Sequence, residues 1–239
     1  MPVVVFANPK GGAGKSTSAV ILSTELARKG APVTILDADP NKPVSTWAKL
    51  QNCPGNIAVL GDISETSIID EIEAAAAKTP FVVVDLEGTA SKTVIYALSQ
   101  ADFVVIPTQG SQLDANEASR AIRVVLQSQK MTKTVTPYAV LLTRTNPSIR
   151  TRTQAHIQKG LVGAGIPVLE TELNERDAFR AVFSFQQTLD GLNPAEVPNL
   201  DKARLNVWEF VHEVVERLKA VEEGRGERDN NETDVAGAA

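Results

Sequence analysis

Short apolar runs alternate along the chain with segments in which apolar residues recur at helical spacing. The runs are continuous, which is typical of strands that are buried on both faces of a parallel sheet. We expect strands at residues 3–6, 33–36, 81–84, 103–106, 138–142 and 167–169, with the fourth strand ending at Pro107. We expect helices at residues 15–29, 43–50, 65–77, 114–129 and 151–162, with Asp114 as the N-cap of the fourth helix.

This order predicts an α/β fold, with a mainly parallel twisted sheet and helices on both faces. Near the end of the chain, Leu205, Trp208, Val211, Val215 and Leu218 recur at helical spacing. We expect this terminal helix to pack on the domain. Residues 222–239 are polar and poor in apolar side chains, which predicts a disordered tail after a single domain that covers residues 1–221.

Composition narrows the location and the kinds of site. The chain has 239 residues, of which 43% are hydrophobic and 22% are charged, as in an ordinary soluble globular protein. Its one cysteine, Cys53, excludes an internal disulfide framework and a cysteine-rich zinc or iron–sulfur site within one chain. We therefore expect a reducing, cytoplasmic location. No stretch approaches the ~18 apolar residues of a membrane-spanning helix, and the N-terminus lacks the basic region of a signal peptide.

Acidic and basic residues are segregated along the chain, although the net charge is only −5. Residues 118–169 contain no Asp or Glu and eight Lys or Arg, so this segment carries +8 and the remainder carries −13. Such segregation can build a basic face that attracts an anionic polymer, because the local field matters more than the net charge. Alternatively, these side chains could be scattered over different faces of the protein, where they would be ordinary solvated charges. The sequence leaves both interpretations open.

A glycine-rich segment directly follows the first expected strand and opens the first expected helix. Its backbone N–H groups are expected to bind phosphate oxygens, and the helix N-terminus adds a favourable dipole. Lys15 would reach the β- and γ-phosphates and the Ser16 hydroxyl would ligate Mg²⁺, so we expect a P-loop for ATP and Mg²⁺. The ordinary P-loop pattern places a glycine where this chain has Pro9. The expected nucleotide-binding residues are Lys10, Gly11, Gly12, Ala13, Gly14, Lys15, Ser16 and Thr17.

The second lysine of this loop, Lys10, makes residues 8–17 resemble the deviant Walker A box of the ParA/MinD family of positioning ATPases. Two further family boxes match in the same order, namely Asp-Ala-Asp-Pro at residues 37–40 and an apolar strand that ends at Asp85. The resemblance extends over residues 2–192 and is closest to the short ParA proteins that lack a helix-turn-helix domain.

The resemblance implies a role for each matched charged residue. Lys10 is similar to the signature lysine that crosses a dimer interface to the partner's nucleotide, where a cation would stabilise developing phosphate charge. Asp39 would orient the attacking water and touch the Mg²⁺ shell, with Asp37 in support. Asp85 would hold Mg²⁺ through water. In isolation, Asp37 and Asp39 would be ordinary turn residues.

The resemblance also implies partners. Family members of this kind form a homodimer with ATP, bind DNA without sequence preference, and are released when a ParB-like or other cargo adaptor stimulates hydrolysis. Such an ATPase would be nucleoid-associated and would segregate plasmid, chromosome or protein cargo. The expected DNA contacts are Arg150, Arg152, Lys159, Arg176 and Arg180. Arg144 lies where the family contacts adenine, so base stacking and the basic face both remain open for it.

Other functional classes compete with this interpretation. A dethiobiotin-synthetase-like ligase uses the same loop, although we find no constellation for its small substrate. Nitrogenase reductase relatives need paired cysteines, which a lone Cys53 does not provide. A membrane-cycling switch would need a basic amphipathic C-terminus, whereas Glu209, Glu213 and Glu216 would be repelled by anionic lipid, so we expect no membrane partner. Glu87 would either perturb the metal shell or point to solvent.

Overall fold

The computed structural model describes residues 1–49, 53–88 and 91–236, with side chains described through residue 224. Its strands are β1 (Val3–Phe6), β2 (Val33–Ala38), β3 (Ile57–Leu60), β4 (Phe81–Leu86), β5 (Phe103–Gln109), β6 (Tyr138–Thr145) and β7 (Leu173–Asn174). Its helices are α1 (Lys15–Arg28), α2 (Pro43–Ala48), α3 (Ile68–Ala76), α4 (Lys92–Ser99), α5 (Gln112–Thr132), α6 (Arg152–Gly163), α7 (Asp177–Ser184) and α8 (Leu200–Ala236). The predicted α/β class is confirmed.

The strands form one sheet in the order β3-β2-β4-β1-β5-β6-β7, and every neighbouring pair is parallel. β1 lies at the centre between β4 and β5. Parallel strands place their carboxyl ends at one edge, which is where ligands bind in sheets of this kind. The segments that follow β1, β2 and β4 therefore converge at that edge.

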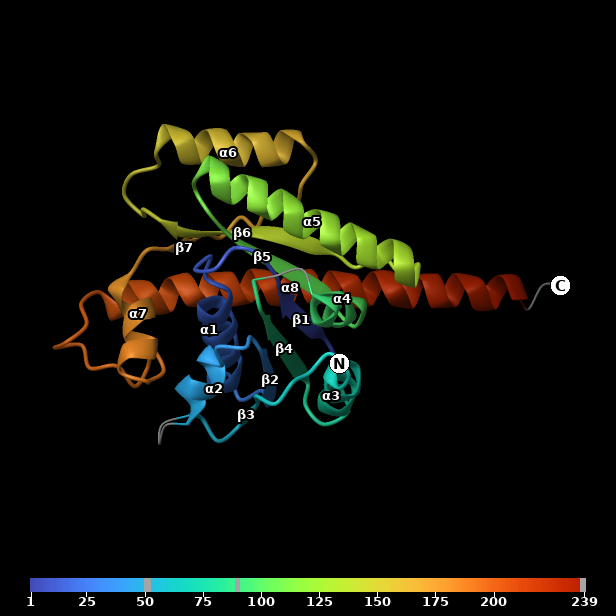
Figure 1. The fold of residues 1–239 in the computed structure, drawn as a ribbon, viewed down its shortest axis with the longest axis horizontal. Helices are drawn as coiled ribbons and strands as arrows, with labels where there is room; N and C mark the ends of the chain where they lie inside the picture. The colour runs from blue at the N-terminus through green and yellow to red at the C-terminus, as the bar shows by residue number, and fades with distance from the viewer. Residues whose placement is uncertain (50–52, 89–90, 237–239) are drawn as a thin grey trace.

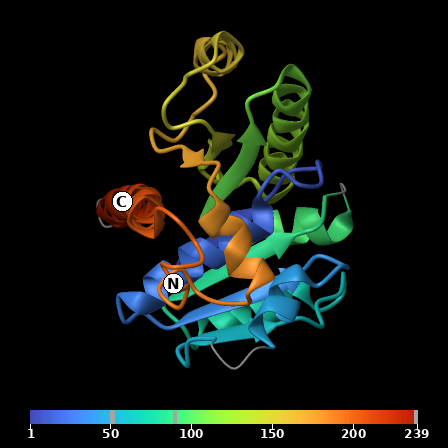
Figure 2. The ribbon, with the colours of Figure 1, turned by 90° about the vertical axis from the view of Figure 1, so that its left-hand side faces the viewer.

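Helices cover both faces of the sheet, and each face has its own core (Figure 1). Successive residues of β1 point to opposite faces, so that Val4 and Phe6 pack with α1, α7 and α8. Val3 and Val5 pack with α3, α4 and α5 in the second core. Figure 2 looks along α8 and shows α8 and α5 on opposite sides of the sheet. A strand buried on both faces explains the continuous apolar runs in the sequence.

The sequence missed β3, α4, β7 and α7, and it ended β5 too early. β5 continues through Pro107 to Gln109, paired with β6. On the side of β5 that faces β1, the Val105 carbonyl accepts a hydrogen bond from the backbone N–H of Ala7. The backbone of Pro107, two residues later in the strand, is directed to the same side. There β1 has already left the sheet, so the missing N–H of Pro107 breaks no ladder bond. The expected strand at residues 167–169 is reduced to a single bridge between Val140 and Val168.

The terminal helix packs on the domain, and three of the five expected residues lie on the packed face. Val211 and Leu218 are buried and Val215 packs against the core. Leu205 and Trp208 are 55% and 44% exposed, whereas Phe210 and Val214 are fully buried. The Glu213 carboxylate accepts hydrogen bonds from the backbone N–H groups of residues 170 and 171. The helix also continues through Ala236, so no break in secondary structure marks the predicted boundary at residue 221, and residues 237–239 lie outside the described part. The division into a domain and a tail stays a prediction.

No helix in the described part of the chain combines the length and the hydropathy needed to cross a bilayer.

Candidate functional site

The glycine-rich loop joins β1 to α1 and leaves the first turn of α1 open to an anion. Gly12 and Gly14 have φ values of 76° and 103°, a left-handed conformation that glycine adopts without strain. Gly14 is the N-cap of α1, no side chain caps the helix, and its first turn holds no acidic residue. The N–H groups of this turn therefore lack a side-chain acceptor, which is the arrangement that binds phosphate.

Side chains from the neighbouring strands hold the loop backbone in place. Gln109 Nε2, at the end of β5, donates a hydrogen bond to the Gly12 carbonyl at 2.8 Å. Thr143 Oγ1, in β6, donates to the Ala13 carbonyl at 2.8 Å. Asn8 Oδ1 accepts from the backbone N–H of residue 10 at 2.8 Å. The sequence places Asn8 in the family box at residues 8–17, but it does not reveal the contacts of Gln109 and Thr143, because those bonds join positions about a hundred or more residues apart in the chain.

Lys15 lies at the start of α1 and is buried. Burial lowers the pKa of its ammonium group, while the carboxylates of Asp85, Asp39 and Glu87 oppose that shift. Its Nζ is 3.4 Å from the carbonyl oxygen of Lys10. The Lys15 ammonium, which is expected to bind phosphate, thus lies close to the loop backbone and among carboxylates that partly balance its charge.

Lys10 forms an ion pair with a residue of the same chain. Its Nζ lies 2.5 Å from Asp114 Oδ1, and Asp114 also accepts a hydrogen bond from the Ser111 hydroxyl. Burial favours the neutral acid, but the hydrogen bonds from Lys10 and Ser111 prevail and lower the pKa of Asp114. Asp114 is therefore a buried partner of Lys10. It is not the N-cap of α5 that the sequence predicts, because Ser111 holds that position and accepts from the Asp114 backbone N–H.

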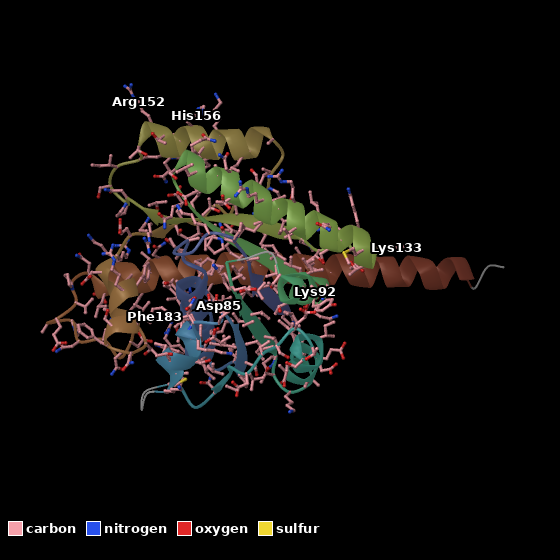
Figure 3. The ribbon with its side chains drawn as sticks, viewed as in Figure 1. Asp85, Lys92, Lys133, Arg152, His156 and Phe183 are labelled. Atoms are coloured by element: carbon pink, nitrogen blue, oxygen red, sulfur yellow. The ribbon has the colours of Figure 1, made fainter. Side chains whose placement is uncertain are left out.

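Asp37 and Asp85 face each other in the register of β2 and β4, and both are fully buried. Burial raises the pKa of Asp85 to about 7, and the charge of the adjacent Asp37 adds to the shift while Lys15 opposes it. Burial also raises the pKa of Asp37, although Asp37 Oδ2 accepts a hydrogen bond from the Ser45 N–H at 2.7 Å. Figure 3 shows Asp85 near the centre of the molecule.

Asp39 lies beyond β2 and caps the turn that follows. Its Oδ1 accepts from the backbone N–H of Asn41 at 2.8 Å and from the Asn41 side chain at 3.0 Å. This is the ordinary turn arrangement that the sequence also allows. Its charge nevertheless acts on Lys15 and Asp85, so it lies near the site that would hold the nucleotide.

Asp37 and Asp85, at the carboxyl ends of β2 and β4, form a carboxylate edge that fits a hydrated Mg²⁺. Both oxygens of Asp85 and Oδ1 of Asp37 are buried without a hydrogen bond of good geometry in the described part of the chain, although the Ser16 hydroxyl is close enough to lower the pKa of Asp85. Oxygen atoms are the ligands Mg²⁺ prefers, and in nucleotide sites it keeps several waters and takes few protein ligands. No group of three or more His, Cys, Asp or Glu suited to a metal occurs among the described residues. A Mg²⁺ ion here would be held by phosphate, water, the Ser16 hydroxyl and these carboxylates.

Three arginines of the sequence prediction line a cavity of about 120 Å³ beside Gly14 and Thr17. They are Arg144, Arg176 and Arg180. Arg176 donates to Asn174 Oδ1 at 3.0 Å, and its Nε atom is buried without a partner among the described residues. Arg180 is paired with Glu175. The structure therefore places Arg176 and Arg180 beside the nucleotide loop, together with Arg144, the candidate for base stacking.

The remaining candidate DNA contacts lie elsewhere. Arg150, Arg152 and Lys159 are exposed on α6 and the loop before it. Arg152 points away from the domain in Figure 3, as does His156, whereas Lys133 lies at the far end of α5. The basic segment thus spreads over α5 and α6 and the loops around them. Arg144, from the same basic segment, lies in β6, so these basic residues come from several elements.

Fold and loop together define a class, the P-loop ATPases of the ParA/MinD type. The chain belongs to the VirC1 protein family, whose model matches residues 1–225. Protein ParA from Rhizobium radiobacter is 39% identical over 218 residues, which cover 91% of this chain and 98% of that protein. The family resemblance inferred from the loop is thereby confirmed.

Two solved structures show the same fold. Apo McdA from Cyanothece superposes with a TM-score of 0.72 at 17% identity, covering 87% of this chain and 98% of that one. Cobyrinic acid a,c-diamide synthase from Mycobacterium smegmatis, with a bound ATP analogue and magnesium, gives 0.62 at 16% identity over 77% and 91%. At such identities the likeness concerns the fold alone.

Replacing Thr143 with valine should weaken ATP binding about tenfold, because it leaves the Ala13 carbonyl without its buried donor at a cost of about 1–3 kcal/mol. Thr143→Ser keeps the hydroxyl and should bind ATP nearly as the unmodified chain does. Isothermal titration with ATP and Mg²⁺ checks both variants. Equal affinities for the valine and serine variants would show that the hydroxyl does not position the loop.

In protein free of nucleotide and Mg²⁺, stability should fall as pH rises from about 4 to about 7. The folded state holds the Asp85 proton more tightly than the unfolded chain does, since burial raises its pKa from 3.8 to about 7. Urea unfolding across this range measures the effect. Asp85→Asn should flatten much of the fall, leaving the part due to Asp37, whereas the exposed Asp62→Asn should leave it unchanged. A slope that survives Asp85→Asn in full would contradict the assignment.

Proposed function

We propose that this chain is an ATP-driven positioning switch that hydrolyses ATP to ADP and phosphate. The observation that carries the proposal is the uncapped start of α1, with Lys15 and Lys10 on the same loop and buried carboxylates at the adjoining strand ends. Membership of a family whose relatives include a ParA protein supports positioning as the purpose of that ATPase.

Each residue of the site has a role in this proposal. The N–H groups of the loop and the Lys15 ammonium bind the phosphates and stabilise the charge that develops during transfer. The Ser16 hydroxyl and the carboxylates of Asp39 and Asp85 hold Mg²⁺, which would neutralise phosphate charge when bound. Asp39 orients the attacking water, with Asp37 in support. Lys10 leaves Asp114 and reaches the nucleotide of a second copy, so that ATP joins a homodimer.

The dimer binds DNA without sequence preference, and a ParB-like or other cargo adaptor stimulates hydrolysis and release. Arg150, Arg152 and Lys159 are the leading phosphate contacts because all three are exposed at the α6 end of the molecule. Arg176 and Arg180, by contrast, line the cavity next to the loop and serve the nucleotide in this proposal. The ATPase acts in the cytoplasm and associates with the nucleoid. Its cargo is a plasmid, a chromosome or a protein assembly.

A metabolic ATP-dependent ligase on the same fold is the second candidate, since one solved neighbour is a cobyrinic acid a,c-diamide synthase. The two functions differ in what ATP turnover requires. A ligase needs a small acid substrate, whereas a positioning switch needs DNA and a protein partner. The sequence relationship favours the switch, because the 39% identity is to a ParA protein over nearly its whole length.

With ATP and Mg²⁺, the chain should bind duplex DNA of arbitrary sequence, and binding should weaken as salt rises because each neutralised phosphate releases counterions. ADP should abolish binding. Fluorescence anisotropy at low and moderate salt measures this. Binding in neither nucleotide state would remove DNA from the proposal and move the ligase to the front.

A charge-matched pair of variants locates the surface in the same assay. Replacing Arg150, Arg152 and Lys159 with alanine should reduce the salt slope by about 0.9 for each lost phosphate contact. Replacing three exposed lysines elsewhere, Lys29, Lys78 and Lys202, should leave affinity nearly unchanged. Equal losses for the two triple variants would mean that net charge, not the α6 end, determines binding.

Asp39→Ala should keep ATP binding and dimerisation but lose hydrolysis, about a hundredfold or more, because no carboxylate then orients the water. The variant should stay on DNA in the presence of ATP. Phosphate release and DNA dissociation measure the two effects. Turnover at the rate of the unmodified chain would leave Asp39 with only its observed role of capping the Asn41 turn.

A further inference from the structure

A cavity of about 140 Å³ lies between α4 and α5, behind the loop that carries the two lysines. α4 and α5 lie side by side on the face of the sheet opposite α8 (Figure 1). The apolar part of the wall comes from Ala7, Val94, Leu98, Ala121 and Val124. A cavity of about 150 Å³ accommodates benzene, so this one has room for a single side chain of leucine or phenylalanine size.

The rim of this cavity is charged, and one of its carboxylates has no direct partner. Glu117 and Arg120 form an ion pair of 2.7 Å along α5 and neutralise each other. Glu87, at the end of β4, is half-buried and has no hydrogen-bond or ion-pair partner among the residues that the structure describes. Its charge acts on Lys15 only through space, without a direct contact. A cation placed against this half-buried carboxylate would add a charge-assisted hydrogen bond.

We propose that this cavity, which we call the α4–α5 pocket, is the docking site for a segment of a partner protein. The segment inserts one leucine-sized apolar side chain between α4 and α5 and places an arginine or lysine against Glu87. The apolar wall favours an apolar inserted side chain, and the Glu87 carboxylate, which has no direct partner, favours a positive charge on the neighbouring residue. An acidic segment would meet two carboxylates at the rim, Glu87 and Glu117, with only one arginine.

The α4–α5 pocket adjoins the segments that hold the nucleotide site. Its lining residue Pro9 directly precedes Lys10, and its lining residue Glu87 follows Asp85 by two positions. These two segments are tightly packed, since a Cβ atom on Gly88 would lie 2.7 Å from the Pro9 carbonyl oxygen. α5, which forms one wall, also carries Asp114, the residue that binds Lys10.

An occupant of the pocket would therefore touch both the segment of Lys10 and the segment of Asp85. On the basis of the proposed function, this contact is the means by which a partner protein changes the rate of ATP hydrolysis. The docking itself does not rest on that function, because the apolar wall and the Glu87 carboxylate are present without nucleotide. The two ideas can thus be tested separately.

The test uses three capped eight-residue peptides with the full chain labelled at its valine and leucine methyl groups. One peptide has a leucine between two arginines, the second has the leucine between two glutamates, and the third has a serine between two arginines. The first should bind about tenfold more tightly than either of the others, since it alone both buries the apolar side chain and meets Glu87 with a cation. Its binding should shift the methyl signals of Val94, Leu98 and Val124.

Two matched variants of α5 provide the control. Val124→Phe fills the pocket and should weaken binding of the leucine–arginine peptide about tenfold, whereas Leu126→Phe, on an exposed position outside the pocket, should not. Glu87→Gln should reduce the preference for arginine over glutamate. Equal binding of the three peptides, shifts on another face, or unimpaired binding by Val124→Phe would overturn the proposal. Failure of ATP-dependent DNA binding would instead remove the proposed function and leave this docking site standing.

Discussion

The opposition of Asp37 and Asp85 across β2 and β4 is the constraint on which the rest of the site depends. Parallel register brings the two carboxylates together at the carboxyl edge of the sheet, where both are fully buried. Burial disfavours the charged form and is the main reason why the pKa of Asp85 rises to about 7, and the nearby charge of Asp37 adds to the shift. The edge therefore needs positive charge, which Lys15 supplies in part and a nucleotide-bound cation would complete.

The loop that carries Lys15 is held from the other half of the sheet. Gln109 and Thr143 fix two of its carbonyl groups from β5 and β6, and Asp114 on α5 binds Lys10. The P-loop thus lies between two parts of the molecule, one with the β2 and β4 carboxylates Asp37 and Asp85, and the other with β5, β6, α5 and α6. Movement of either part would change the loop, which is the physical requirement of an ATPase that reports its nucleotide state to a distant surface.

Function follows less directly from the fold than from the site and its relatives. The same sheet occurs in a McdA protein and in a cobyrinic acid a,c-diamide synthase, which shows that the architecture hosts unrelated purposes. The two lysines of the loop, the carboxylate edge and the relationship to ParA and VirC1 proteins narrow the choice to a positioning ATPase. Two cavities adjoin the loop, one lined by Arg144, Arg176 and Arg180 and one lined by apolar side chains of α4 and α5 together with Glu87.

The sequence by itself determined the α/β class, the loop, the family and the strand ends that carry Asp37 and Asp85, because continuous apolar runs and glycine spacing are local signals. It missed β3, α4, β7 and α7, whose short or mixed patterns carry no such signal. It placed Val211 and Leu218 correctly on the buried face of α8 but added the exposed Leu205 and Trp208, which fit helical spacing as well as the buried Phe210 and Val214 do. Only the tertiary structure decided that Lys10 meets Asp114, that Thr143 holds Ala13, and that Arg176 and Arg180 lie beside the loop. These contacts join residues far apart in the chain, and their partners are set by packing and not by local spacing.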